Sequence, residues 1–151
     1  ISRTYVFETH TKELLYLNGE ESARLSLKLT QEWDPSFRAL FHLQDRSQTS
    51  TLRVSSAFPN IMPWEPSGNV TLMGDAIHAM SPSGGVSAVT ALRDAALLSN
   101  TISKFGISAS SIGEYEAAMR GYAQASIERS YFGGKKMFGQ EPFEKCKPLE
   151  V

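Results

Sequence analysis

Asp75 lies between a short apolar run and a glycine-rich loop, where a carboxylate could bind a ligand. Residues 70–73 are apolar or β-branched and predict a strand that is buried on both faces. Pro82, Gly84 and Gly85 follow Asp75 and predict a loop. Ligands of open α/β sheets lie beyond the carboxyl ends of strands, and glycines let a flat ligand approach the backbone. We therefore expect Asp75 to accept hydrogen bonds from the hydroxyls of a sugar-like group.

The glycine loop leads into a predicted helix whose first turn could hold the same ligand. From Val86 onward, apolar or small residues recur three or four positions apart, which favours a helix. These residues are Val89, Leu92, Ala96 and Ser99. The start of a helix offers unpaired backbone N–H groups and a partial positive charge. The order of strand, acidic turn, glycine loop and helix suits a ligand with a polyol chain and an electron-rich ring edge.

The same stretch contains a specific pattern of glycine, acidic, proline and alanine residues. The pattern consists of Gly74, Asp75, Ala76, His78, Pro82, Gly85, Ala91, Asp94 and Ala95. It resembles the second FAD-binding motif of single-component flavoprotein monooxygenases, the aromatic hydroxylases of the para-hydroxybenzoate and salicylate hydroxylase type. Residues 29–40 and 64–72 are similar to the same family, more loosely.

The resemblance implies an α/β fold in which the chain supplies parts of two domains. Residues 1–66 would belong to a substrate-binding domain and contribute to its sheet. Residues 67–132 would form the C-terminal part of a Rossmann-like FAD-binding domain, and residues 133–151 would form a tail.

The resemblance also implies an FAD site, with NAD(P)H as co-substrate and an aromatic or similar small molecule as the substrate that is hydroxylated with O₂. Asp75 would bind the ribityl or ribose hydroxyls, Pro82 would lie beside the flavin ring, and residues 85–89 would face its pyrimidine edge. No catalytic residue is identified. The implied cofactor-binding residues are Gly74, Asp75, Pro82, Gly84, Gly85, Val86 and Ser87.

Two positions depart from the family pattern. The family usually has a second glycine and then an asparagine where this chain has Ser87 and Val89. Ser87 places a Cβ where the backbone would approach the flavin, and Val89 lacks the hydrogen-bonding groups of an amide. These departures predict weaker flavin binding.

The Gly-x-Gly-x-x-Gly turn that binds the ADP part of FAD is absent from the sequence. We therefore expect the chain to be the C-terminal portion of a longer monooxygenase, inactive without an N-terminal half. One alternative is a truncated or decayed relative that binds no flavin and acts as a non-catalytic interaction module. Another is a flavin-fold enzyme with a different outcome, such as an epoxidase, a Baeyer–Villiger-type oxygenase or a halogenase.

Other polar residues of the stretch are predicted to have structural roles. His78 is interpreted as a loop histidine that fixes the local backbone, and Asp94 as a helix-surface or packing charge. No second His or Cys has metal-ligand spacing, and no Gly-x-Ser-x-Gly sequence occurs. Neither a metal site nor a hydrolase triad is predicted.

The composition of the chain limits which partners and locations are expected. The 151 residues carry a net charge of -1, which does not favour nucleic acid as a partner. No apolar run approaches the roughly 18 residues of a membrane helix. Cys146 is the single cysteine, so no internal disulfide can form, and this fits an intracellular, cytoplasmic location.

The remaining segments predict two more strands and three more helices. The strands are expected at residues 3–9 and 52–58. Leucines in residues 20–33 alternate as in a strand but also fit a helical face, and the acidic start of this segment favours a helix. Asp34 and Pro35 predict the cap and first turn of a short helix that buries Phe37, Leu40 and Phe41. The last helix is expected to begin with a capping box over residues 111–114 and to end at Gly133-Gly134. Its apolar positions are Ile112, Tyr115, Met119, Tyr122, Ser126 and Ile127.

Overall fold

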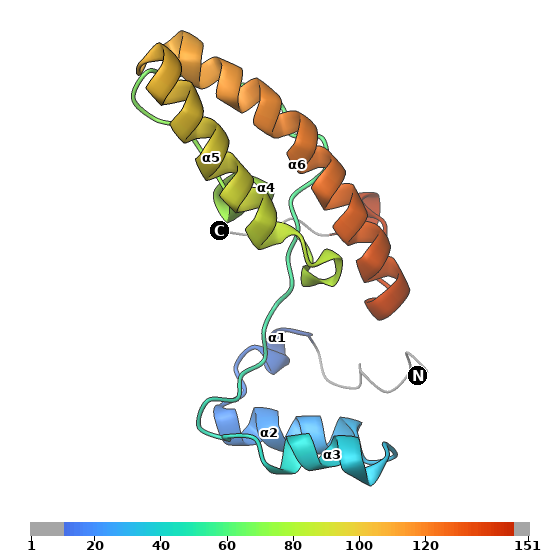
Figure 1. Cartoon of the computed structure of the whole chain (residues 1–151). Helices are drawn as coiled ribbons and strands as arrows, with labels where there is room; N and C mark the ends of the chain where they lie inside the picture. The colour runs from blue at the N-terminus through green and yellow to red at the C-terminus, as the bar shows by residue number, and fades with distance from the viewer. Residues whose placement is uncertain (1–10, 147–151) are drawn as a thin grey trace. The chain divides into compact units, whose positions relative to one another are not determined.

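The computed structural model describes residues 11–146, and the regular elements among these residues are all helices (Figure 1). The chain divides into two compact units, Ile1–Arg53 and Val54–Val151. The assignment of residues 1–66 and 67–132 to two domains stays a prediction. Within the described part of the chain, no helix has the length and apolar character needed to cross a membrane.

In the first unit, α1 (Thr11–Leu14) precedes α2 (Gly19–Leu29) and α3 (Pro35–His42). Asn18 caps α2 through a reciprocal pair of hydrogen bonds with Glu21, in which each side chain accepts from the other residue's N–H. Asp34 caps α3 as predicted, and its carboxylate accepts from the Ser36 N–H at 2.9 Å. Hydrogen bonds from the Ser36 hydroxyl and N–H lower the pKa of Asp34. Both predicted helices are therefore confirmed, although α2 ends at Leu29 rather than at residue 33.

The predicted burial of the apolar residues of α3 is wrong for two of the three. Phe37 and Leu40 are 63% and 69% exposed. Phe41 is half-buried and packs edge-on against Trp33, with ring centroids 5.7 Å apart. Helix α3 contacts α2, and a single neighbouring helix covers only one face of a short helix.

The second unit is built on two long helices, α5 (Ser87–Phe105) and α6 (Ala109–Phe138), which lie side by side (Figure 1). The short elements α4 (Asp75–His78) and η2 (Pro82–Gly84) pack against them, and η3 (Phe143–Lys145) follows α6. Tyr115, Met119 and Ala123 of α6 form the core, with Leu97 and Leu98 of α5 packed against it. The predicted burial of apolar α6 positions is confirmed at Ile112, Tyr115, Met119 and Ile127.

The predicted sheet does not form among the described residues. Residues 52–58 and 70–73 belong to no strand, and the predicted strand at residues 3–9 lies outside the described residues. A strand needs a neighbouring segment to complete its ladder of hydrogen bonds. No described segment provides one for residues 70–73, and Val70, Leu72 and Met73 remain exposed. The strand predictions over residues 52–58 and 70–73 are therefore wrong for this structure.

Both predicted ends of the last helix need correction. The capping box pairs Ser108 with Ser111, so α6 begins at Ala109 instead of after Ser111. The helix continues through Gly133-Gly134 to Phe138, and Gly139 ends it with a φ of +64°. Glycine is the residue that most readily adopts this left-handed conformation.

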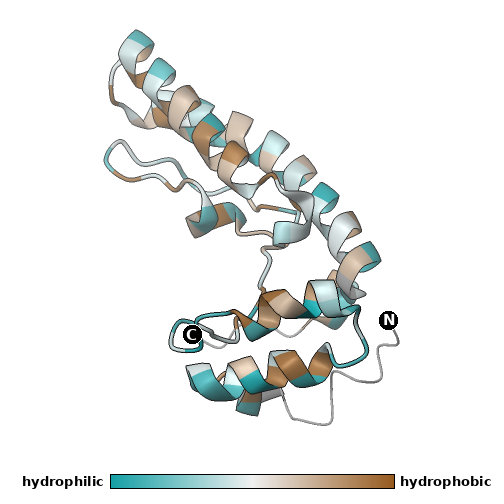
Figure 2. Cartoon of the chain, turned by 60° about the horizontal axis from the view of Figure 1, so that its bottom comes forward, coloured by the Kyte–Doolittle hydropathy of each residue, from teal (hydrophilic) through white to brown (hydrophobic). Residues whose placement is uncertain are grey.

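The apolar residues whose spacing predicted helix α5 lie on its exposed face. The helix is confirmed, but Val89 and Leu92 are 65% and 70% exposed, and the buried positions are Thr90, Asp94 and Thr101. Large apolar side chains also remain exposed elsewhere, and Figure 2 shows hydrophobic stretches on helices of both units. The periodicity therefore identified the helix but not its buried face.

Candidate functional site

Asp75 lies at the start of α4, directly after a glycine in the left-handed region. Gly74 has a φ of +60° and precedes the first residue of α4. The Asp75 side chain is exposed, and its Oδ1 accepts a hydrogen bond from the Ser87 hydroxyl at 2.9 Å. Among the described residues no hydrogen bond to the other oxygen, Oδ2, is observed. The predicted acidic turn is therefore next to the start of α5 and retains a free acceptor.

The N-terminus of α5 is open. Val86 occupies the capping position, and no side chain of the described residues caps the helix there. The first N–H groups of a helix have no partner inside it, and Ala88 and Val89 of this first turn are exposed. Gly85, with a φ of +63°, is also exposed, and a Cβ built on it would have no neighbour within 4 Å. The first turn thus presents backbone donors and a partial positive charge beside open space.

The glycine loop is fixed by the second half of α6. The Ser83 hydroxyl donates to the Ser130 carbonyl oxygen at 2.9 Å. A Cβ on Gly84 would collide with Ser130 Oγ and come within 2.9 Å of Ser130 Cα, and a Cβ on Gly133 would lie 2.9 Å from the Ser83 carbonyl oxygen. Close approach at two glycines therefore sets the position of η2, which contains Pro82 and Gly84.

A buried carboxylate connects α4, α5 and α6. Asp94 is 0% exposed, and its Oδ2 accepts from the Gly74 N–H at 2.8 Å and lies 2.6 Å from His78 Nε2. Its Oδ1 accepts from the Tyr122 hydroxyl at 2.6 Å. Burial and then the hydrogen bond to Asp94 raise the pKa of Tyr122, so this hydroxyl stays a donor.

These contacts decide the two structural interpretations made from the sequence. Asp94 is a packing charge, and the surface alternative is wrong. His78 contacts the network as the last residue of α4 and helps to fix the backbone around Gly74. The contribution of Tyr122 was missed, although three polar residues at helical spacing, Thr90, Asp94 and Thr101, were a signal that α5 has a buried polar face.

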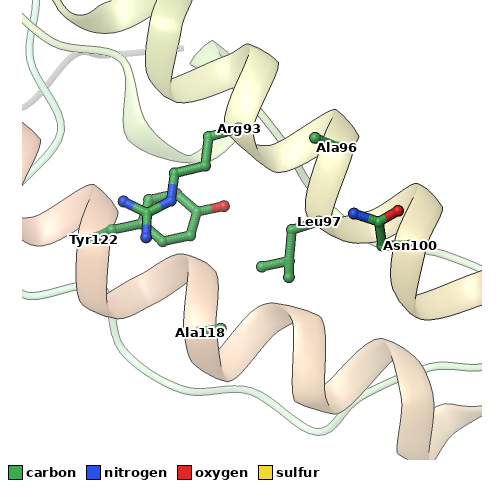
Figure 3. A pocket seen from close by; sticks show the side chains of 6 residues that line it. All are labelled: Arg93, Ala96, Leu97, Asn100, Ala118 and Tyr122. Atoms are coloured by element: carbon green, nitrogen blue, oxygen red, sulfur yellow. The ribbon is translucent and has the colours of Figure 1, made fainter.

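A shallow groove of about 430 Å³ lies between α5 and α6 (Figure 3). Arg93 and Tyr122 lie at one end, where the guanidinium carbon is 3.9 Å from the ring centroid. The other lining residues are Ala96, Leu97, Asn100 and Ala118. None of the predicted cofactor-binding residues lines this groove. No cluster of His, Cys, Asp and Glu among the described residues could hold a metal ion.

An acidic turn and a glycine loop beside the open start of a helix are typical of proteins that bind dinucleotides and flavins. The family of FAD binding domains matches residues 18–130, and the chain belongs to this family. The sequence resemblance and the predicted cofactor, FAD, are thereby confirmed, as is the FAD-binding part of the fold prediction.

Several monooxygenases from other organisms are similar to the chain, two of them over most of its length. A dual O-methyltransferase/FAD-dependent monooxygenase of Cercospora beticola is 50% identical over 130 residues, which cover 85% of this chain and 15% of that protein. Another dual O-methyltransferase/FAD-dependent monooxygenase, from Phaeosphaeria nodorum, is 43% identical over 89% of this chain and 16% of its own length. An FAD-dependent monooxygenase of Aspergillus calidoustus is 37% identical over 75 residues, or 44% of this chain and 16% of that protein. No solved structure matches the chain.

Proposed function

We propose that the chain contributes part of the FAD site of a flavoprotein monooxygenase. In this proposal the enzyme uses NAD(P)H and O₂ to hydroxylate an aromatic or similar small molecule. The observation that carries it is the free Oδ2 of Asp75 beside the uncapped start of α5, in a chain of the FAD binding domain family. The chain spans about 15% of the length of the relatives it matches, so an N-terminal partner half is part of the proposal.

The residues present fit FAD in two respects. The exposed carboxylate of Asp75 retains one oxygen for a ribityl or ribose hydroxyl. The backbone at Gly85 is open on the side that a Cβ would occupy, which leaves room for a flat ring. We assign Gly74, Gly84 and Val86 to shaping this backbone, and Pro82, which is exposed, to contact with the ring.

The chain's residues would bind and orient the cofactor while the cofactor carries the redox chemistry. Bound FAD would supply the electrons that activate O₂ for hydroxylation. Asp75 would orient the cofactor through its hydroxyls. The first N–H groups of α5 would stabilise negative charge at the ring edge that faces them, because the helix dipole is positive there.

Retention of flavin tests the proposal directly. We would incubate the purified 151-residue chain, and a form extended toward the N-terminus, with FAD, and record visible absorption after desalting. A retained flavin band in either form supports the proposal. Absence of the flavin band from both forms would contradict it.

Removing the Asp75 carboxylate should weaken FAD binding. We expect Asp75→Ala to cost about 1–3 kcal/mol of binding free energy, the scale of a lost hydrogen bond to a charged group. Stability should change little, because the Asp75 side chain is exposed. Glu114→Ala, a change at an exposed acidic residue of α6, is the matched control and should leave the FAD dissociation constant unchanged. Equal dissociation constants for wild type and Asp75→Ala would remove Asp75 from the site.

Restoring the family residues at the two departures should tighten FAD binding. Ser87 places its Cβ on the first turn of α5 and also donates to Asp75 Oδ1, the same carboxylate that would bind the cofactor. The double variant Ser87→Gly/Val89→Asn removes this competing donor and adds an amide at an exposed position. We expect a lower FAD dissociation constant by titration. An unchanged value would show that neither position limits binding.

The alternative function is a non-catalytic interaction module without flavin. The observation that favours it is the apolar face of α5, where Val89 and Leu92 are exposed, together with the hydrogen bond that Ser87 makes to Asp75. Failure of both the wild type and the double variant to retain FAD in the full-length protein would favour this alternative.

A further inference from the structure

The buried carboxylate of Asp94 is placed to control the geometry of the proposed cofactor loop without touching the cofactor. Its Oδ2 accepts from the N–H of Gly74, the residue directly before Asp75. Since a carboxylate only accepts, His78 Nε2 must carry the proton in the contact with the same oxygen. Asp94 therefore joins both ends of α4 to the middle of α5.

Burying the Asp94 carboxylate costs free energy of hydration, and packing contacts alone do not explain why a charged residue occupies this position. Moving a carboxylate out of water is strongly unfavourable, and an apolar side chain at such a position often leaves the protein as stable. Leu97 and Leu98 show that this part of α5 accepts apolar residues at partly buried positions. What the carboxylate adds is an acceptor for the Gly74 N–H, at a glycine with a φ of +60°.

We propose that Asp94 is the positioning residue of the FAD site. By fixing the left-handed backbone of Gly74, it holds the Asp75 carboxylate against the start of α5, where Asp75 meets Ser87. This inference rests on the proposed FAD site and adds a residue that acts through Gly74. The Tyr122 hydroxyl donates to the other oxygen, Oδ1, and within residues 11–146 it makes no hydrogen bond to the loop backbone.

The different roles of the two oxygens allow a matched experiment in the full-length protein. Asp94→Leu replaces the carboxylate with an apolar side chain of similar size and so removes both acceptor oxygens. Asp94→Asn keeps one carbonyl oxygen that can accept from Gly74 and His78, while its amide donates to the Tyr122 hydroxyl. Tyr122→Phe is the control, because it removes one hydrogen bond from the same carboxylate but leaves the bond to Gly74. We would measure the FAD dissociation constant, visible circular dichroism of bound flavin at saturating FAD, and the unfolding midpoint.

We expect Asp94→Leu to weaken FAD binding by about tenfold or more, the scale of a buried N–H left without its acceptor, and to change the flavin spectrum. Asp94→Asn should recover most of the lost affinity. Tyr122→Phe should lower the unfolding midpoint and leave affinity and spectrum unchanged. The proposal is overturned if Asp94→Leu binds FAD like wild type, or if Tyr122→Phe weakens binding as much as Asp94→Leu does.

Two additions keep the test decisive. If Asp94→Leu does not fold, the same change is made together with Gly121→Ala, which adds helix propensity in open space on α6. If the wild type binds no FAD, the proposed function fails, and amide hydrogen exchange then tests the positioning role by itself. Faster exchange at Gly74 and Asp75 in Asp94→Leu, but not in Tyr122→Phe, supports that role, and equal exchange overturns it.

Discussion

Replacing Gly133 by alanine is expected to lower the free energy of unfolding by about 1–3 kcal/mol, the usual cost of overpacking. The same replacement at Gly121, on the same helix, should raise it by about 0.5–1 kcal/mol through helix propensity. The two glycines differ in what a Cβ would meet. At Gly133 it would lie 2.9 Å from the carbonyl oxygen of Ser83, whereas at Gly121 it would meet nothing within 4 Å.

The effect at Gly133 should extend to the proposed cofactor site. The clashing atom belongs to the backbone, so the clash can be relieved only if η2 or α6 shifts. Because η2 contains Pro82 and Gly84, Gly133→Ala should also weaken FAD binding, and Gly121→Ala should not. Equilibrium urea unfolding and FAD titration of both variants measure these effects. Equal stability of the two variants would show that the contact between Gly133 and Ser83 imposes no constraint.

The helices whose ends depend on local contacts were predicted from the sequence. Asp34 caps α3 through the N–H of Ser36, two residues away. Ser108 caps α6 through the N–H of Ser111, three residues away, and the capping box was expected three residues later, over residues 111–114. The central motif also led to the correct family, because the residue types in that stretch are specific. Such features involve neighbours in sequence, so the sequence alone contains the information they need.

Features that depend on distant segments were not predicted. Gly133-Gly134 was expected to end α6, but the helix continues to Phe138, and these glycines lie against Ser83 and Gln140. Residues 70–73 are rich in strand-forming types, yet a strand also needs a partner for its backbone groups. Residue type and spacing reveal neither the segments that pack against Gly133-Gly134 nor whether residues 70–73 have a pairing partner.

The buried face of α5 shows the same limit most clearly. Apolar spacing favoured Val89 and Leu92, yet the helix buries Thr90 and Asp94. Polar residues can be buried when partners satisfy them. Thr90 bonds to Ser126 at 3.1 Å, and Asp94 bonds to Tyr122. Both partners belong to α6. The periodicity of residues in α5 contains no information about which residues of another helix will contact it.

Replacing His78 by leucine should destabilise the protein by about 3 kcal/mol, the scale of a buried pair that loses one partner. His78 and Asp94 are both fully buried, with 2.6 Å between Nε2 and Oδ2. Leucine would fill much of the same space but would leave Oδ2 with the Gly74 N–H as its only observed donor among the described residues. The remaining charge would have less compensation for its lost hydration.

Glutamine at position 78 distinguishes the stability contributed by the hydrogen-bond donor from the stability contributed by the volume of the imidazole ring. The side-chain amide of His78→Gln can donate from about the place of Nε2, so we expect urea unfolding to show a loss of less than about 1 kcal/mol in the free energy of unfolding. His78 Nδ1 is buried and makes no hydrogen bond with the described residues, so its removal should cost little. A loss for His78→Gln as large as that for His78→Leu would mean that the ring stabilises by shape alone. If only leucine destabilises, the hydrogen bond to Asp94 is what holds α4 to the two long helices.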